Sequence, residues 1–305
     1  MSHTHHQTPR HDDGVHRPEH EHEHAHDRDR DSRHDHDDRG QAEILELDAE
    51  VLAQHMAAVT AWLPLKSEPR QIVDLGCGTG AGTFALLERF PDAHVTGVDS
   101  SAGHLRLLHE KAAARGVEGR TRTVRADLDA SHWPDLGRPD LVWASASLHH
   151  MADPDRALAS VRELLAPGGL FAVVELTDFP RFLPAHAPEK RPGLEERVHA
   201  AIDSFHAERV PHRGADWRTT LTAAGFTVED ERTLTVDIAG ERSEAVGRYA
   251  YGSLQRIRAV AAPALAAEDL AALDELLDIS GPNCLLHRED LAVRTERTVW
   301  AARRA

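Results

Sequence analysis

The 305-residue sequence has little of several features that would place it in a specialised class. Its only two cysteines, Cys77 and Cys284, exclude a disulfide-stapled secreted fold and favour a reducing, cytoplasmic setting. No run of 18 apolar residues occurs, and the amino terminus has no apolar segment typical of a signal peptide. We therefore expect neither a membrane span nor export.

An excess of basic residues is also missing. Asp and Glu total 51 against 35 Lys and Arg, which gives a net charge of -16 at pH 7 with histidine neutral. A nucleic-acid ligand needs a basic footprint, and here the basic residues are scattered among more numerous acids. The composition therefore argues against a nucleic-acid partner.

Apolar residues are nearly absent from residues 1–40, which hold 11 histidines, 11 acids, 6 arginines and 3 apolar residues. We predict a disordered His-rich tail, because nothing there offsets the entropy lost on ordering. Imidazole and carboxylate groups bind divalent metals, so we expect weak metal binding by the tail but no fixed metal site. One alternative function follows: a metal-binding or metal-responsive protein that acts through the tail, with the fold as a non-catalytic binding module.

Beyond the tail, short apolar segments alternate with helical patterns. An amphipathic helix is expected from Glu43 to Leu63, where apolar residues recur every three to four positions. The β/α alternation that follows predicts an α/β fold with a doubly wound, mostly parallel sheet. The expected strands are 71–75, 94–98, 120–125, 140–144, 170–175, 226–237 and 292–302, and the expected helices are 81–90, 102–115, 154–165, 194–207, 216–224, 243–261 and 266–278.

Prolines at 180, 184, 188 and 192 interrupt the alternation and indicate an insertion. We therefore divide the chain into four parts. These are the tail (1–40), a core with its amino-terminal helix (41–178), a cap insertion (179–215), and a carboxyl-terminal part of the sheet (216–305) that contains a helical insertion at about 243–278.

The strongest motif is VDLGCGTG at residues 73–80, a strand that ends in a glycine loop and opens into a helix. Glycines let the backbone approach a ligand closely. Asp99 closes the next strand, where its carboxylate can accept both hydroxyls of a ribose. A nicotinamide dinucleotide site has similar glycine spacing, which makes an oxidoreductase the third candidate function. Asp74 counts against it, because its charge would face an anionic pyrophosphate. Cys77 is expected to be a packed residue rather than a nucleophile.

Three more segments follow in order along the chain. VRADL at 124–128 follows the third expected strand, where Asp127 is able to accept a hydrogen bond from an adenine amino group and Leu128 is able to pack on the adenine ring. DLVWASASLHHMADP at 140–154 carries two adjacent histidines past the next strand. LLAPGGL at 164–170 is a helix end, a Pro-Gly-Gly turn and a strand start.

Taken in this order, the segments from about Gln71 to Glu175 resemble the class I S-adenosylmethionine-dependent methyltransferases, particularly the small-molecule group. The resemblance implies a Rossmann-like sheet of seven strands with an antiparallel last strand, and S-adenosylmethionine as cofactor. It implies these contacts: Gly76, Gly78 and Gly80 with the methionine portion, Asp74 with its ammonium group, Asp99 with the ribose, Ser100 and Leu128 with the adenine faces, Asp127 with the adenine amino group, and Ser145 near the methionine end.

A sulfonium methyl is already activated, so the protein must mainly align a small-molecule acceptor for in-line displacement and exclude water. A base is needed only if the acceptor must lose a proton. The candidates at strand ends are His149, His150 and Glu175. Both histidines have an alternative structural role, because residues 148–154 turn the chain into the next helix. The acceptor pocket is expected among the segments outside the resemblance, with these candidates, each with ordinary packing or surface exposure as its alternative role: Trp217, His206, His212, Tyr249 and Tyr251.

Overall fold

The computed structural model describes residues 1, 40–239 and 243–304, with the backbone alone for residues 204, 206, 208 and 209. The His-rich tail predicted to be disordered and to bind metals weakly lies outside the described residues. Residues 38–305 form one unit, and the description below concerns this unit. No described helix has the length and apolar character needed to cross a membrane.

Seven strands of the described chain form one sheet in the order β3-β2-β1-β4-β5-β7-β6. The pairs among β1 to β5 are parallel, whereas β7 is antiparallel to both β5 and β6. This confirms the predicted Rossmann-like, mostly parallel sheet with an antiparallel last strand. The strands are β1 (Gln71–Leu75), β2 (His94–Asp99), β3 (Thr121–Arg125), β4 (Leu141–Ser145), β5 (Leu170–Leu176), β6 (Phe226–Ala239) and β7 (Ala292–Arg304).

Helices cover both faces of this sheet. One face carries α2 (Ala53–Trp62), α3 (Ala81–Arg89) and α4 (Ala102–Ala114), and the other carries α5 (Pro154–Leu164) and α7 (Trp217–Ala223). Because both faces are covered, the central strands are apolar at successive positions rather than at alternate ones.

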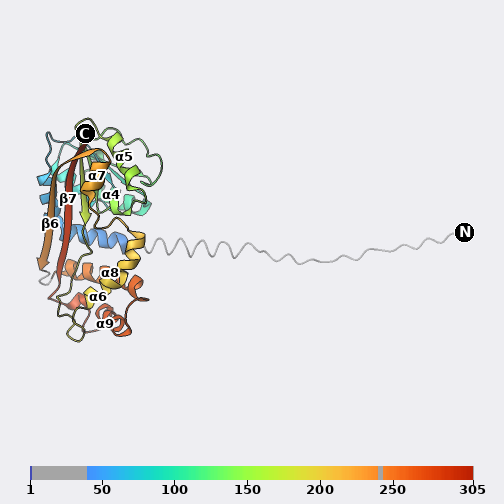
Figure 1. Ribbon diagram of the computed structural model, residues 1–305, viewed down its shortest axis with the longest axis vertical. Helices are drawn as coiled ribbons and strands as arrows, with labels where there is room; N and C mark the ends of the chain where they lie inside the picture. The colour runs from blue at the N-terminus through green and yellow to red at the C-terminus, as the bar shows by residue number, and fades with distance from the viewer. Residues whose placement is uncertain (2–39, 240–242, 305) are drawn as a thin grey trace. The chain divides into compact units, whose positions relative to one another are not determined.

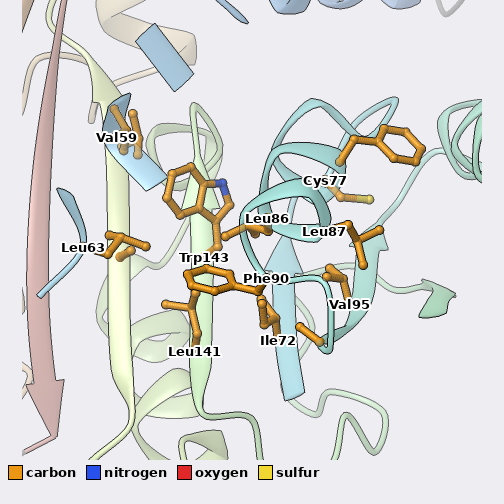
Figure 2. Packing of buried hydrophobic residues seen from close by; sticks show 14 of the residues in the cluster. Val59, Leu63, Ile72, Cys77, Leu86, Leu87, Phe90, Val95, Leu141 and Trp143 are labelled. Atoms are coloured by element: carbon orange, nitrogen blue, oxygen red, sulfur yellow. The ribbon is translucent and has the colours of Figure 1, made fainter. Parts of the chain in front are cut away.

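The core on the first face centres on Trp143 of β4, which is fully buried. Figure 2 shows its indole beside Phe90 and Leu86, with Leu141 on the same strand and Ile72 on the neighbouring β1. Trp217, considered a pocket residue from the sequence, is also fully buried, in the core of the opposite face. It therefore packs the sheet and does not line a pocket.

A third helical group packs beside the far ends of the two long antiparallel strands. It consists of α6 (Leu194–Arg209), α8 (Glu244–Ala261) and α9 (Ala267–Leu277), and its core includes Val293 at the start of β7. Figure 1 shows β6 and β7 running past the parallel strands to this group. Three short 3-10 helices complete the described elements: η1 (Glu118–Arg120), η2 (Leu148–His150) and η3 (Leu285–His287).

The first helix differs from its prediction. The sequence predicts one helix over 43–63, but residues 40–51 are helical, Leu52 is a turn, and α2 begins at Ala53. The two halves bury their apolar residues in different cores: Leu47 packs with the third helical group, whereas Val59 packs on the sheet. A straight helix cannot turn the same stripe toward both cores, so the chain bends between them.

The order of the strands also locates the site. The chain winds outward from β1 through β2 to β3, then returns to place β4 on the other side of β1. Adjacent parallel strands that lead away in opposite directions leave a crevice at their carboxyl ends, which is where α/β sheets bind ligands. The glycine loop and Ser145 follow these two strands.

Candidate active site

The glycine loop after β1 is held close to the neighbouring strand ends. The backbone amides of Gly76 and Cys77 both donate to the carbonyl of Val98, at 2.8 and 3.0 Å. Gly76 has a φ of +67°, and a Cβ on it would lie 2.5 Å from the Cβ of Ser147. Glycine is therefore required at this position, both by conformation and by the close approach of the loop after β4.

A cavity of about 490 Å³ opens at the carboxyl ends of β1, β2 and β4, beside the helix of residues 40–51. A larger hollow of about 720 Å³ lies between that helix, α3 and α4, away from the strand ends. The smaller cavity brings together eight of the nine predicted cofactor residues: Asp74, Gly76, Gly78, Asp99, Ser100, Asp127, Leu128 and Ser145.

Gly80 is the ninth predicted cofactor residue, and it does not line the cavity. It caps α3 with a φ of +98°, and a Cβ on it would lie 2.9 Å from the side chains of Leu108 and Phe84. This placement favours a role in helix entry, and the ligand contact that the resemblance implies for Gly80 stays a prediction. Gly80 lets the loop turn into the helix and lets α3 pack closely on α4.

Asp99 is held at the end of β2 by donors on both of its oxygens. The amides of Gly78 and Ser101 donate at 2.9 and 2.8 Å, and His104 Nδ1 lies 3.5 Å away. Burial alone would raise the pKa of Asp99, but the hydrogen bonds from His104, Ser101 and Gly78 together hold it below its ordinary value. Asp99 is thus a fixed anion with lone pairs left for hydroxyl donors.

Asp74 lies deeper in the cavity, with 2% of its surface exposed. Its carboxylate accepts one hydrogen bond, from the Thr83 hydroxyl at 2.7 Å. Burial raises the pKa of Asp74 to about 7, and the charge of Asp99 adds to the rise. A cationic group in the cavity would offset this cost of burying the charged form. Burial likewise raises the pKa of the Cys77 thiol well above its ordinary value.

The adenine-side candidates lie at the other end of the cavity. Asp127 and Leu128 follow β3, and Asp127 also accepts the amide of Asp129 at 2.9 Å. Ser100 follows β2, and Ser145 is the last residue of β4. One side of this end is thus polar, whereas Leu128 supplies an apolar wall, an arrangement suited to a flat ring that carries a donor group.

His149 and Glu175 form a buried pair beneath the cavity. Their side chains are each 3% exposed, and His149 Nδ1 lies 2.5 Å from the Glu175 carboxylate. Glu175 also accepts the amides of Ser147, Leu148 and His149, at 3.2, 2.8 and 3.4 Å. With every contact directed to the turn after β4, the pair positions that turn. This placement argues against the base roles expected for these two residues.

His150 differs from its neighbour, because it lines the cavity and its ring is exposed at the cavity mouth. The protein around its other sides desolvates the ring, and His149 lies 4.2 Å away between centroids. Desolvation and the neighbouring His149 lower the pKa of His150 to about 4. His150 is therefore neutral at pH 7 and has a nitrogen able to accept a proton.

Several cavity residues carry no recognisable sequence signal. Thr79 lines the cavity with a fully buried hydroxyl that has no hydrogen-bond partner in the described chain. Asp48 and Arg297 also line it, joined by a 2.6 Å ion pair, and the Tyr249 hydroxyl donates to the same Asp48 oxygen at 2.6 Å. These three come from the first helix, β7 and α8, so only folding brings them together.

The remaining pocket candidates have mixed placements. Tyr249 is buried and contacts the cavity only through Asp48, whereas Tyr251 packs at the edge of the third helical core. His212 lies beside Trp217, with ring centroids 6.3 Å apart. The side chain of His206 lies outside the described residues.

The charges of the cavity restrict what it can hold. Its wall carries five carboxylates, those of Asp48, Asp74, Asp99, Asp127 and Asp129. A pyrophosphate would meet these charges without a basic partner in the glycine loop, so the wall disfavours a dinucleotide. Within the described ranges, no group of three or more His, Cys, Asp or Glu residues is arranged to hold a metal ion.

Known proteins resemble the chain around this site. The model of a family described as methyltransferase domain matches residues 73–171. Trans-aconitate 2-methyltransferase of Methylobacterium nodulans is 33% identical over 188 residues, which cover 61% of this chain and 69% of the relative. The enzyme of the same name from Methylobacterium radiotolerans is 41% identical over 117 residues, covering 38% of this chain and 42% of the relative.

The aligned length and the shared fold decide how much these similarities say about function. For the first relatives matched, the aligned part spans less than half of the relative's own length. The crystal structure of the [4+2]-cyclase SpnF shares the fold, with a TM-score of 0.50 and 21% identity over 83% of this chain and 81% of that one. A protein named as a cyclase thus shares this architecture, so the reaction must be argued from the site.

Proposed function

Because this chain belongs to the class I S-adenosylmethionine-dependent methyltransferases, we propose that it transfers the methyl group of S-adenosylmethionine to a small-molecule acceptor. One observation carries the proposal: Asp74 and Asp99 face a single cavity from adjacent strand ends, beneath a glycine loop that is open to a ligand. Asp74 is a buried carboxylate that a cation would stabilise, which fits the ammonium group of this cofactor. Asp99 has lone pairs free for hydroxyl donors, which fits the ribose.

The residues present fit the cofactor at each of its parts. Asp74 would pair with the ammonium group, and the unpartnered Thr79 hydroxyl would bond the methionine portion. Asp99 would accept the ribose hydroxyls with the lone pairs that Gly78 and Ser101 leave free. Asp127 and Leu128 would meet the adenine edge and face.

When bound, the cofactor supplies a methyl carbon whose bond to a positively charged sulfur breaks, with its electron pair going to sulfur, as the acceptor lone pair bonds to carbon. The chain contributes alignment and exclusion of water. His150 faces the cavity neutral and would take the acceptor's proton if the acceptor must lose one. His149 and Glu175 would act beneath it by fixing the turn.

For the acceptor, the proposal names a class, a small molecule, and not a compound. The relatives are named for trans-aconitate, which makes that acid the first acceptor to assay. A cytoplasmic location is proposed as well, supported by the free thiols of Cys77 and Cys284.

Calorimetric titration of S-adenosylmethionine and S-adenosylhomocysteine into the metal-free protein tests the cofactor site. Asp99→Ala removes two charge-assisted hydrogen bonds and should weaken binding by about 1.5–3 kcal/mol per bond at most. Asp92→Ala is the matched control, since Asp92 is exposed at the opposite end of β2. Micromolar binding that falls only in Asp99→Ala supports the proposal, and absence of binding to either ligand contradicts it.

A further inference from the structure

Arg213 lies in a turn between α6 and α7 that touches the reactive edge of the sheet. Gly214, with a φ of +67°, approaches so closely that a Cβ on it would lie 3.2 Å from the carbonyl oxygen of Thr177. Thr177 directly follows β5, whose carboxyl end adjoins that of β4. The turn therefore brings Arg213 to the side of the cavity where His150 stands.

The guanidinium of Arg213 contacts an aromatic ring but has no carboxylate partner at ion-pair distance among the described residues. It stacks over the ring of Phe179, 3.4 Å from the ring centroid, and makes no hydrogen bond or ion pair with any described residue. Its Nε is shielded from solvent and has no partner in the described chain. Desolvation lowers the pKa of Arg213 to about 10. Arg213 is partly buried, and a desolvated cation that makes no hydrogen bond or ion pair leaves its donors available to an anionic ligand.

The nearby carboxylates do not fill this role. Glu175 is engaged by His149, and Asp178 pairs with Arg181 at 3.1 Å. Asp203 of α6 also acts on Arg213 through its charge, but the two side chains form no hydrogen bond or ion pair. Arg297, the arginine that lines the cavity, is neutralised by Asp48. Arg213 stands beside the carboxyl end of β5 and has no hydrogen-bond or ion-pair partner among the described residues. Its charge contributes to lowering the pKa of His150, which places the two groups in one electrostatic neighbourhood.

We propose that Arg213, stacked on Phe179, is a specificity-determining residue that binds a carboxylate of the methyl acceptor. A guanidinium matches a carboxylate with two parallel hydrogen bonds, and stacking on an aromatic ring fixes the plane of that fork. The acceptor class is therefore a small carboxylic acid whose reacting atom reaches the cavity beside His150. This inference rests on the proposed function and assigns its substrate class.

Binding rather than turnover tests the inference, with named probes. Trans-aconitate and benzoate are titrated into the full chain, alongside trimethyl trans-aconitate, benzamide and sulfate, both with and without saturating S-adenosylhomocysteine. The variants are Arg213→Met, which keeps the length and removes the charge, and Arg213→Lys, which keeps the charge and removes the fork. Arg218→Met is the control, because Arg218 lies on α7 and already pairs with Glu231 of β6.

At least one carboxylate should bind tenfold or more tighter than its neutral partner and tighter than sulfate. Arg213→Met should weaken that binding by about 10- to 100-fold, the effect of losing charge-assisted hydrogen bonds. Arg213→Lys should fall between, and Arg218→Met should bind as the parent does. Affinity for S-adenosylhomocysteine should stay within twofold in all variants, which shows that they are folded.

Three results would overturn the inference: equal binding of acids and neutral partners, undiminished binding in Arg213→Met, or preference for sulfate over every carboxylate. Failure of the proposed function has a different signature, namely absence of S-adenosylhomocysteine binding in the parent. In that case, the titrations of carboxylates without S-adenosylhomocysteine still test whether Arg213 binds a carboxylate.

Discussion

At the scale of single residues, the pKa values of Asp74 and Asp99 are shifted in opposite directions although the two carboxyl groups line one cavity. Both lie in the carboxyl-terminal parts of adjacent strands, and both line the cavity. Asp99 is stabilised as an anion by backbone amides, whereas Asp74 has one hydroxyl partner and is almost fully buried. The number of donors, rather than burial alone, decides which carboxyl is charged at neutral pH.

This difference predicts pH-dependent cofactor binding. The pKa of Asp74 is raised to about 7, so the residue is protonated below pH 7, and a bound ammonium group favours its charged form. Binding should therefore release a proton, and affinity for S-adenosylhomocysteine should rise on the order of tenfold between pH 5.5 and 7, since one pKa unit corresponds to a factor of ten. Calorimetry in buffers of different ionisation enthalpy measures both effects.

Asp74→Asn is the control for this linkage, because it keeps the shape and the bond to Thr83 but cannot titrate. Its binding should be weaker at pH 7 and nearly flat across the same range. A steep pH dependence that persists in Asp74→Asn would assign the proton to another group.

At the scale of elements, buried carboxylates join segments that the sequence separates. Glu195 of α6 accepts the amides of Phe182 and Leu183 at 2.8–3.0 Å, which ties the proline-rich stretch to its helix. Burial raises the pKa of Glu195 to about 7. Asp269 plays the same part at the start of α9, where it accepts from both Arg191 and Arg197.

Asp269→Ala should loosen α9 from α6. Its carboxylate is 5% exposed but its arginine partners are 36% and 42% exposed, so solvent screens the loss. We expect the free energy of unfolding to fall by about 1–3 kcal/mol, between the values for exposed and buried pairs. Urea denaturation measures the change. Asp274→Ala, on the same helix as Asp269, removes an exposed ion pair with Arg258 of α8 and should leave the midpoint unchanged. Equal effects of the two substitutions would contradict the burial argument.

At the scale of the whole molecule, the described unit has three hydrophobic cores, two on the faces of the sheet and one among the capping helices. The helix of residues 40–51 belongs to the third core through Leu47, and it contributes Asp48 to the cavity wall. The ion pair between Glu46 and Lys111 also ties it to α4. The segment next to the His-rich tail is thus part of the site.

Removal of residues 1–39 separates the methyltransferase function from the metal-binding alternative. The described lining of the cavity begins at Gln41, so the truncated chain should bind S-adenosylhomocysteine within twofold of the full chain. Binding of Ni²⁺ or Zn²⁺ should fall sharply, because 11 of the 23 histidines are removed. Calorimetry with both ligands makes the comparison. Cofactor binding that requires the tail, or that requires metal, would favour the alternative.

The sequence by itself determined what depends on neighbours along the chain. The strands, the helices around the sheet and the glycine loop follow from apolar periodicity and from residues such as Gly76, whose conformation no other residue adopts cheaply. Asp74 and Asp99 were also predictable, because parallel strands end at one edge of a sheet and so bring their last residues together.

Only the tertiary structure decided what depends on contacts between distant segments. The first helix bends because its two halves pack in different cores. His149 differs in role from His150 because Glu175 binds His149. Gly80 packs against Leu108 of α4 and does not line the cavity. The role proposed for Arg213 depends on the position of its turn beside the end of β5 and on the lack of a described hydrogen-bond or ion-pair partner, and neither is visible in the sequence. Burial and pairing are properties of the folded chain, so local sequence patterns do not encode them.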